Sequence, residues 1–548
     1  MFARSAAPPS RAEAEDAPRT LGDLPEHAAR LAPRRVAVVT PEGRWTFQDL
    51  CADLLDVARG LIRIGLAPGE RSAILLPNGI HYLRAFYGAA CAGIVSVPVN
   101  TFLAPAEVVS ILNDSGAAAL VTTRRRLAAL APHLSRLPSL RRLIVVPGEE
   151  GPAAALPPWA LEVRWESVLE GGAAALPPPP RSGQMAVLTY TSGTTGRIKG
   201  VMLSHSNLLA NARSCIEAVK VNEKDRLLLF LPMFHSLTQT VCMVTPLLAA
   251  LTVIILPGVD RAAIGAALRR YRPTIFLAVP AIYAAMAERR PGFVARRLNS
   301  VRLYLCGGAP LTVEVLRRFE RGWRRPLCEG YGLSEASPAV CLSPVDGERR
   351  GGSVGPAMPG VEVRLVREDG SEAAVGDIGE VLVRGANVMI GYYQRPGETA
   401  GVLRDGWLHT GDLGRLDGDG YLYLVGRRKE MLIFRGMNIY PREVEEVLAA
   451  HPAVAEAAVV GLGDQQRGEV PHAAVALRPG ASVSDQELRA YCRERLARYK
   501  VPRSILMMAA LPRNATGKIR KERIRQSIEA VRPSVAITPQ EDPDSQGT

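Results

Sequence analysis

The stretch "TFQDLCADLLDVARGLIRIGL" (46–66) sets the pattern from which the fold can be predicted. Apolar residues recur within it at three- and four-residue spacing: Leu50, Leu54, Val57 and Leu61. This spacing predicts an amphipathic helix. The next two apolar runs, "ERSAILLP" (70–77) and "IVSVPVN" (94–100), are short, β-rich and bounded by Gly, Pro or Asn, as buried strands are. Their alternation with the helix predicts an α/β domain with a largely parallel sheet.

The same alternation resumes after a proline-rich linker and continues past residue 300. From Gly360 the pattern changes to short strands separated by Asp-Gly turns, which predicts an antiparallel, barrel-like subdomain. A boundary is expected near "GRRKE" (426–430). Beyond it, Pro441 is suited to the first position of a helix. We therefore predict a large domain over 21–428, a smaller one over 429–528, and disordered tails over 1–20 and 529–548.

Composition narrows the function classes. The chain has 548 residues, 47% hydrophobic and 22% charged, which are globular values that allow more than one domain. Its eight cysteines form no C-x-x-C pair, so a zinc ribbon or a thioredoxin-like redox site is not expected. The net charge of +13 comes mostly from arginines dispersed in Ala- and Pro-rich sequence, without an aromatic-interleaved basic stripe. We expect no nucleic-acid partner; anionic ligands and acidic membrane surfaces are the remaining interpretations of the charge.

The termini and the longest apolar run indicate a cytoplasmic protein. The first twenty residues contain no apolar segment of the kind found in secretory signals. The run "TVCMVTPLLAALTVIILPG" (240–258) falls short of the roughly 20 residues that span a membrane, and it contains Pro246. We interpret it as a buried helix followed by the strand "TVIIL".

One loop suggests phosphate chemistry: "YTSGTTGRIKG" (190–200). Its glycines are too close together for the loop G-x-x-x-x-G-K-[ST], and Lys199 does not directly follow a glycine. The stretch follows a predicted strand and is too glycine-rich for a regular element. Its hydroxyls, freed backbone N–H groups and lysine would form a nest for polyphosphate: Thr191, Ser192, Gly193, Thr194, Thr195, Gly196 and Lys199. The alternative is a surface linker.

Five further motifs accompany this loop in order: "CGGAPL" (306–311), "EGYGLSE" (329–335), "GWLHTGD" (406–412), "GRRKEMLIFRGMNIYPREVEE" (426–446) and "LPRNATGKIRK" (511–521). Together they resemble the core motifs of the adenylate-forming superfamily over about residues 20 to 525. The resemblance implies the acyl-CoA synthetase fold: two α/β sheet subdomains, a barrel-like β subdomain and a small mobile α+β C-terminal domain. "NVMIGYYQRPGETA" and "LPMFHS" look most like fatty acyl-CoA ligases. Two departures are Ile198, where the family usually has proline, and "SLTQT" after His235, which lacks a common glycine.

The resemblance implies a two-step reaction with ATP, Mg²⁺ and CoA. A carboxylate forms an acyl-AMP and releases pyrophosphate, and the thiol of CoA then displaces AMP. Glu335 is the expected Mg²⁺ ligand, assisted by Thr191, because hard oxygen donors suit this ion. His235 is expected to stand between the acyl pocket and the nucleotide. The remaining nucleotide contacts are expected at Gly307, Gly308, Ala309, Pro310, Tyr331, Gly332, Ser334, Asp412 and Arg427.

The C-terminal motifs complete the expected site. Lys518 would place a cation on the charge that develops at the α-phosphate and the carboxylate. Lys429 matches the family's hinge position, and Gly436 lies on the segment expected to line the CoA tunnel. A medium- or long-chain fatty acid is the leading substrate, with an aryl-CoA ligase, an acyl-AMP ligase that loads a carrier protein, and a non-catalytic nucleotide- or membrane-binding protein as alternatives. Contact with the inner membrane surface and a homodimer are further hypotheses.

Overall fold

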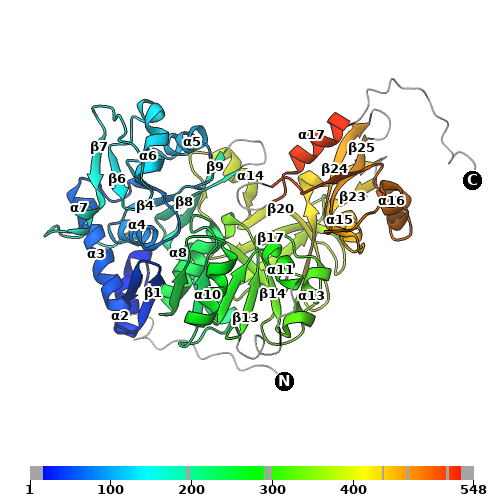
Figure 1. Cartoon of the computed structure of the whole chain (residues 1–548), viewed down its shortest axis with the longest axis horizontal. Coiled ribbons are helices and arrows are strands. Elements are labelled where there is room, and N and C mark those ends of the chain that lie inside the picture. Colours follow the sequence, from blue (N-terminus) through cyan, green and yellow to red (C-terminus); the bar gives the residue numbers. More distant parts are fainter. Residues whose placement is uncertain are drawn as a thin grey trace, which may run out of the picture. The chain divides into compact units, whose positions relative to one another are not determined.

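The computed structural model describes residues 17–192, 198–288, 292, 299–434, 437–464, 468–513 and 518–531. Two compact units form along the chain (Figure 1). The first runs to Thr410 and includes Arg415–Tyr423. The second takes Gly411–Gly414 and continues from Leu424.

The first unit contains an eight-stranded sheet in the order β18-β9-β8-β4-β3-β5-β6-β7. Its strands are β3 (Arg71–Leu75), β4 (Val95–Pro98), β5 (Ala119–Thr123), β6 (Arg142–Val146), β7 (Leu161–Arg164), β8 (Met185–Ser192), β9 (Ile198–Ser204) and β18 (Gly391–Tyr392). The strands from β8 to β7 are parallel, while β9 and β18 add antiparallel pairs at one edge. The prediction of a largely parallel α/β sheet is therefore confirmed.

A second eight-stranded sheet has the order β15-β14-β13-β12-β10-β11-β1-β2. Its strands are β1 (Val36–Thr40), β2 (Gly43–Thr46), β10 (Arg226–Leu229), β11 (Thr252–Ile255), β12 (Ile275–Ala278), β13 (Leu303–Cys306), β14 (Leu327–Gly332) and β15 (Ala339–Leu342). Only its two edge pairs are antiparallel. The parallel strand ends of β13 and β14 carry two of the predicted nucleotide motifs.

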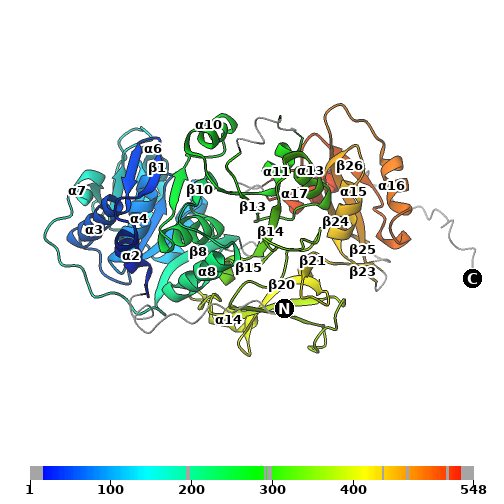
Figure 2. The same cartoon turned by 90° about the horizontal axis from the view of Figure 1, so that it is seen from below.

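Helices connect the strands of both sheets (Figures 1 and 2). They are α2 (Leu24–Leu31), α3 (Phe47–Arg63), α4 (Ile80–Cys91), α5 (Pro105–Ser115), α6 (Arg124–Leu130), α7 (Trp165–Leu169), α8 (His205–Ala218), α9 (Thr245–Leu248), α10 (Arg261–Tyr271), α11 (Pro280–Ala287) and α13 (Val313–Trp323). The helix predicted after Thr46 is α3, and the Thr46 side chain caps it by accepting the N–H of Asp49. Its predicted apolar face is buried.

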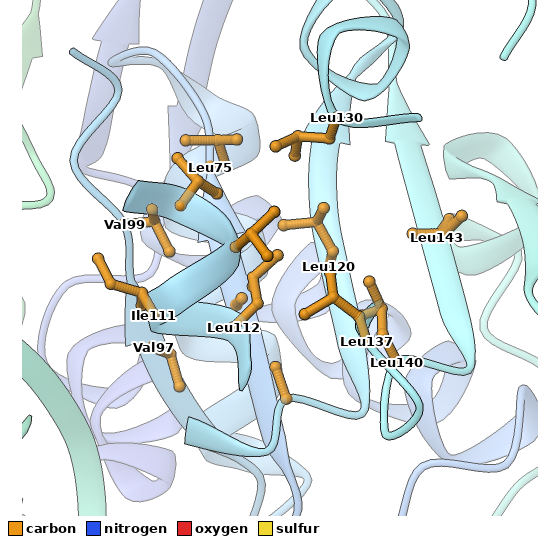
Figure 3. Close-up of a cluster of buried hydrophobic side chains, with 14 of the residues drawn as sticks. Leu75, Val97, Val99, Ile111, Leu112, Leu120, Leu130, Leu137, Leu140 and Leu143 are labelled. Atoms are coloured by element: carbon orange, nitrogen blue, oxygen red, sulfur yellow. The ribbon is translucent and has the colours of Figure 1, made fainter. Parts of the chain in front are cut away.

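Branched aliphatic side chains fill the core of the first sheet. Figure 3 shows Leu120 and Leu143 of adjacent strands together with Ile111 and Leu112 of α5. Partly buried Ile198 and Met202 of β9 pack against the same cluster. The core therefore extends to the strand that carries the predicted phosphate lysine.

The long apolar run is confirmed as helix followed by strand. A π-helix covers Thr238–Val244, α9 follows, and β11 is the predicted strand. In the described part of the chain, no helix combines the length and apolarity needed to cross a membrane.

An antiparallel sheet completes the first unit, as the Asp-Gly turns predicted. Its strands are β16 (Val361–Val366), β17 (Gly379–Gly385), β19 (Leu403–Arg404), β20 (Trp407–Leu416) and β21 (Leu422–Arg427). The short helix α14 (Pro396–Val402) precedes β19. Of these strands, the residues Gly411–Gly414 of β20 and those of β21 from Leu424 onward belong to the second unit.

The second unit is an α+β sandwich. Its sheet contains β22 (Leu432–Phe434), β23 (Met437–Ile439), β24 (Val454–Asp464), β25 (Gly468–Leu477) and β26 (Ile505–Met508). Its helices are α15 (Pro441–Ala449), α16 (Asp485–Arg493) and α17 (Lys521–Val531). Pro441 opens α15, as predicted.

Both faces of this sheet are buried, because side chains alternate along the strands. Val459 of β24 joins a cluster with Val444 of α15 and Leu488 of α16. Its neighbours along β24, Ala458 and Val460, join a different cluster with Ile524 and Ile528 of α17. Helices α15 and α16 thus cover one face and α17 covers the other.

Candidate active site

The predicted phosphate loop lies between two strands that pair with each other. Strands β8 and β9 pair so that Thr191 faces Lys199 and Ser192 faces Ile198. Four of the predicted loop residues lie outside the described residues: Gly193, Thr194, Thr195 and Gly196. The expectation of an irregular loop across 190–200 is wrong at both ends, because strand pairing extends to Ser192 and resumes at Ile198.

The strand pairing also explains Ile198. This residue replaces the family's usual proline, and its side chain packs against the core cluster of the first sheet. A β-branched residue is favoured on such a half-buried pleated surface. Ile198 therefore anchors the strand on which Lys199 lies.

Lys199 has two partners that the sequence analysis did not assign. Its ammonium forms an ion pair with Glu398 of α14, and it lies 5.1 Å from the centre of the Tyr392 ring. Only 17% of the Lys199 side chain is exposed. Strand β18 brings Tyr392 there, because Tyr392 pairs with Val201 of β9.

Tyr392 also reaches the predicted magnesium ligand. Its hydroxyl donates to Oε1 of Glu335 at 2.9 Å, and the backbone carbonyl of Glu335 accepts the N–H of Met389 at 2.8 Å. Tyr392 is 8% exposed. One buried phenol thus joins the predicted metal carboxylate to the predicted phosphate lysine. The motif "NVMIGYYQRPGETA" contains Tyr392, but spacing alone gave no reason to choose it.

The residues around Glu335 fit a magnesium ion held largely by substrate. Among the described residues, no group of three or more His, Cys, Asp or Glu side chains gathers into a metal cage. Mg²⁺ is commonly bound by one or two protein carboxylates together with substrate phosphates. Glu335 is a single carboxylate held by the Tyr392 hydroxyl, and the Tyr392 ring also contacts Lys199. This arrangement suits a magnesium ion that takes most of its ligands from the substrate phosphates.

The two nucleotide motifs of the second sheet meet at adjacent strand ends. Cys306 of β13 is in register with Glu329 of β14, so the segment 307–310 leaves the sheet beside β14, which carries Tyr331 and Gly332 at its end. Gly332 permits a close turn, because a Cβ there would lie 2.1 Å from the carbonyl oxygen of Pro338. Gly308 has a φ of +83°, which favours glycine. Tyr331 is buried.

The His235 segment packs beside these motifs. Ser236 Oγ lies 3.0 Å from Ser334 Oγ. A Cβ placed on Gly307 would lie 3.6 Å from Leu237. The structure therefore brings the predicted gating histidine, the Gly307–Pro310 segment and the Tyr331–Glu335 segment into one neighbourhood.

The residues after His235 are buried and polar. Gln239 is fully buried, and its Nε2 donates to the carbonyl of Phe234 at 2.8 Å. The hydroxyl of Thr240 donates to the carbonyl of Ser337 at 2.6 Å. The side-chain oxygens of Thr238 and Gln239 are buried and form no hydrogen bond of normal geometry within the described residues, and the buried Tyr82 hydroxyl lies next to the Gln239 side chain. The "SLTQT" departure thus places polar groups where they are costly unless something satisfies them.

In the second unit, two predicted nucleotide residues meet. Arg427 Nε lies 2.9 Å from Oδ1 of Asp412, and Asp412 is 6% exposed. Lys429 lies in a 3₁₀ turn, Arg428–Glu430. Lys518 is exposed, and its neighbour Ile519 forms an isolated bridge with Arg513. Gly436 lies outside the described residues.

Comparison with known proteins gives a consistent family. A family model described as AMP-binding enzyme matches residues 25–393, and one described as AMP-binding enzyme C-terminal domain matches residues 443–518. A feruloyl-CoA synthase from an Amycolatopsis species is 37% identical over 508 residues, which are 92% of this chain and 98% of that protein. A long-chain-fatty-acid–CoA ligase from Bacillus subtilis is 34% identical over 531 residues, covering 92% of this chain and 94% of that protein.

Solved structures agree with these relatives. The anthranilate CoA ligase AuaEII in complex with anthranoyl-AMP matches with a TM-score of 0.85 at 27% identity, covering 94% of this chain and 99% of that one. The o-succinylbenzoate coenzyme A synthetase of Bacillus subtilis in complex with ATP and magnesium matches with a TM-score of 0.79 at 30% identity, covering 92% and 99%.

Proposed function

The chain belongs to the AMP-binding enzymes of the adenylate-forming superfamily, and we propose that it activates an aryl acid bearing polar substituents. Its relatives place it among the acid–CoA ligases, which use ATP and CoA. Aryl acids and fatty acids both remain candidate substrates on family grounds. The polar segment after His235 favours the aryl acid.

The observation that carries this proposal is the 37% identity to a feruloyl-CoA synthase, and the buried polar segment Thr238–Thr240, which contacts the loop after Glu335, agrees with it. A buried acceptor without a donor costs about 1–3 kcal/mol, and a phenolic hydroxyl of the substrate is a donor that would offset this cost. An alkyl chain offers no such partner.

The residues of the first unit would bind the leaving pyrophosphate. The ammonium of Lys199 and the hydroxyl of Thr191 would hold the β- and γ-phosphates. Glu335 would help to hold Mg²⁺, which supplies charge neutralisation at the phosphates when bound. Tyr331 would stack on the adenine.

The residues of the second unit would bind the nucleotide and complete adenylation. Asp412 would accept hydrogen bonds from the ribose hydroxyls, with Arg427 holding its carboxylate in place. Lys518 would stabilise the negative charge that develops as a carboxylate oxygen attacks the α-phosphate and pyrophosphate leaves. In the second step, the thiolate of CoA attacks the acyl carbonyl and AMP leaves. Lys429 would serve as the hinge position between the two steps.

A fatty acid is the second candidate. The Bacillus subtilis long-chain-fatty-acid–CoA ligase, 34% identical, favours it. The apolar residues around the π-helix, such as Leu237 and Val244, suit an aliphatic chain as well as a ring.

A panel of acids tests the proposal. Formation of AMP and of the CoA thioester is measured with hydroxycinnamic, benzoic, medium-chain and long-chain acids, with a carrier protein as an alternative acceptor. We expect the highest kcat/KM with a substituted aryl acid. We expect Gln239→Leu to lower that value by about tenfold while leaving alkyl acids little changed. A clear preference of the unaltered enzyme for long-chain acids would overturn the aryl proposal and establish the second candidate.

The net charge of +13 supports a further, separate proposal of peripheral attraction to anionic lipid. Cosedimentation with phosphatidylserine vesicles should fall as salt rises from about 0.05 to 0.5 M, because such attraction is screened. Equal binding to neutral vesicles would contradict it.

A further inference from the structure

Lys521 connects three elements of the second unit. It is the first residue of α17, and its Nζ lies 3.0 Å from Oε2 of Glu430 and 2.8 Å from Oε1 of Glu445. The same Oε1 of Glu445 accepts the backbone N–H of Val459 at 2.8 Å. One ammonium is therefore shared by the turn Arg428–Glu430 and by helix α15.

This cluster lies at an edge of the sheet. In the described part of the second unit, β24 pairs with β25 on one side only, so β24 is an edge strand. Helix α15 covers one face of the sheet and α17 covers the other (Figure 1). Lys521 reaches from α17 to Glu445 of α15, and Glu445 caps an edge N–H of β24. The ion pair thus ties the two helical layers together around the edge strand.

The electrostatics favour a charged cluster. Burial would lower the pKa of the Lys521 ammonium, but the carboxylates of Glu445 and Glu430 outweigh burial and raise that pKa. Burial would likewise raise the pKa of Glu430, but Lys521 outweighs it and holds that pKa below its usual range. Both groups remain ionised at neutral pH, so the contact is a half-buried ion pair, which is costly to break by removing one partner.

The position of this cluster along the chain gives it a functional meaning. Glu430 directly follows Lys429, the proposed hinge residue, and lies in the same 3₁₀ turn. Lys521 lies three residues after Lys518 in the sequence. The chain between them is held by the bridge of Ile519 to Arg513 and by the Arg520 N–H, which donates to the carbonyl of Pro512 at 2.7 Å.

We propose that Lys521 is a positioning residue that fixes the hinge-proximal turn and the Lys518 segment to one rigid body. The two segments then move together when the second unit changes orientation between the two half-reactions. This inference rests on the proposed function for the roles of Lys518 and Lys429. The ion pairs of Lys521 with Glu430 and Glu445 do not depend on those roles, because they lie within the second unit.

Another lysine of the same unit provides a matched control. Lys500 pairs with both carboxylate oxygens of Glu443 at 2.8 Å, and Glu443 lies on α15 like Glu445. Its side chain is 19% exposed, against 27% for Lys521. Lys500→Met therefore removes a comparable ion pair from the same helix without touching the turn or the Lys518 segment.

The test begins with amide hydrogen exchange on the full chain. We expect Lys521→Met to accelerate exchange by at least about tenfold in peptides that cover 426–434 and 511–520. Glu430→Gln should accelerate only the first peptide, because Lys521 keeps Glu445. Lys500→Met should leave both peptides unchanged, and Lys521→Arg should restore most of the protection. Equal acceleration by Lys521→Met and Lys500→Met, or acceleration spread over the whole unit, would overturn the proposal.

Separate assays of the two half-reactions distinguish a positioning role of Lys521 from a general loss of stability. ATP–pyrophosphate exchange reports adenylation, and thioester formation from supplied acyl-AMP reports the second step. We expect Lys521→Met to lower kcat for adenylation by about tenfold or more, with KM for the acid unchanged. Glu430→Gln should preserve adenylation and slow the complete reaction. Normal adenylation in Lys518→Ala would refute the proposed role of Lys518, whereas the exchange data would still decide the role of Lys521.

Discussion

Replacing Tyr392 by phenylalanine removes one hydroxyl from the middle of the candidate phosphate site. The ring stays, so its contact with Lys199 at 5.1 Å is kept. The lost interaction is the hydrogen bond of 2.9 Å to Glu335 Oε1. The change therefore tests whether the orientation of Glu335 matters for the use of magnesium and ATP.

The expected loss of MgATP affinity follows from the negative charge of the Glu335 carboxylate, which accepts the hydrogen bond. A hydrogen bond to an ionised carboxylate contributes about 1.5–3 kcal/mol. If that contribution is lost only when MgATP is bound, affinity falls by roughly 10- to 150-fold. Partial replacement of the hydroxyl by water would place the result at the low end of this range. The acid and CoA do not contact this hydrogen bond in the proposal, so their KM values should stay within about twofold.

The assay combines turnover with binding. KM for ATP is measured at several Mg²⁺ concentrations, and the affinity for MgATP is measured by calorimetry without acid. We expect Tyr392→Phe to require more Mg²⁺ and to bind MgATP more weakly. Tyr393→Phe is the matched control, because the neighbouring ring packs against the core cluster.

Two results would refute the reasoning. The first is an unchanged Mg²⁺ requirement in Tyr392→Phe, which would show that the hydroxyl does not orient a metal carboxylate. The second is an equal loss in Tyr393→Phe, which would show that the effect comes from general loosening of strand β18.

Three further predictions concern other charged groups. Lys518→Ala should abolish ATP–pyrophosphate exchange but spare thioester formation from supplied acyl-AMP; equal loss of both would contradict the division of roles. Glu398→Gln should lower KM for ATP by up to about fivefold, because it releases Lys199 from a partly exposed ion pair; a higher KM would show that the pair helps to position Lys199. Burial lowers the pKa of His205 to about 4, and its Nδ1 accepts the Leu21 N–H at 3.1 Å. The unfolded chain takes up this proton near pH 6.5, so stability should fall by about 3 kcal/mol as pH drops from 6.5 through 4, and urea unfolding of His205→Asn should show a flatter pH profile.

Much of the fold follows from local periodicity. The helix α3 and strands β3 and β4 were predicted from spacing and bounding residues, and Pro441 marked the start of α15. Strand β9 was not predicted, because glycine and lysine near its start look like loop composition. Its pairing with β8 supplies the hydrogen bonds that local propensity does not indicate.

In the candidate site, too, some residues could be predicted from the sequence and others could not. Glu335, Lys199 and Asp412 were chosen because their motifs stand in a recognisable order along the chain. Tyr392 and Glu398 were missed, since an isolated tyrosine or glutamate carries no signal of its partner. Each meets Lys199 across about two hundred residues of sequence, through the pairing of β18 with β9.

The sequence by itself indicated the family, through motifs that resemble those of the adenylate-forming enzymes, and it indicated many of the helices and strands, through periodicity, because motifs and periodicity are local properties of the chain. Only the tertiary structure decided which charges are paired. The Tyr392 bridge to Glu335, the Glu398 partner of Lys199 and the Lys521 tie between α17 and α15 all join residues that are distant in sequence. Their partnerships depend on strand register and on which helix covers which face of a sheet.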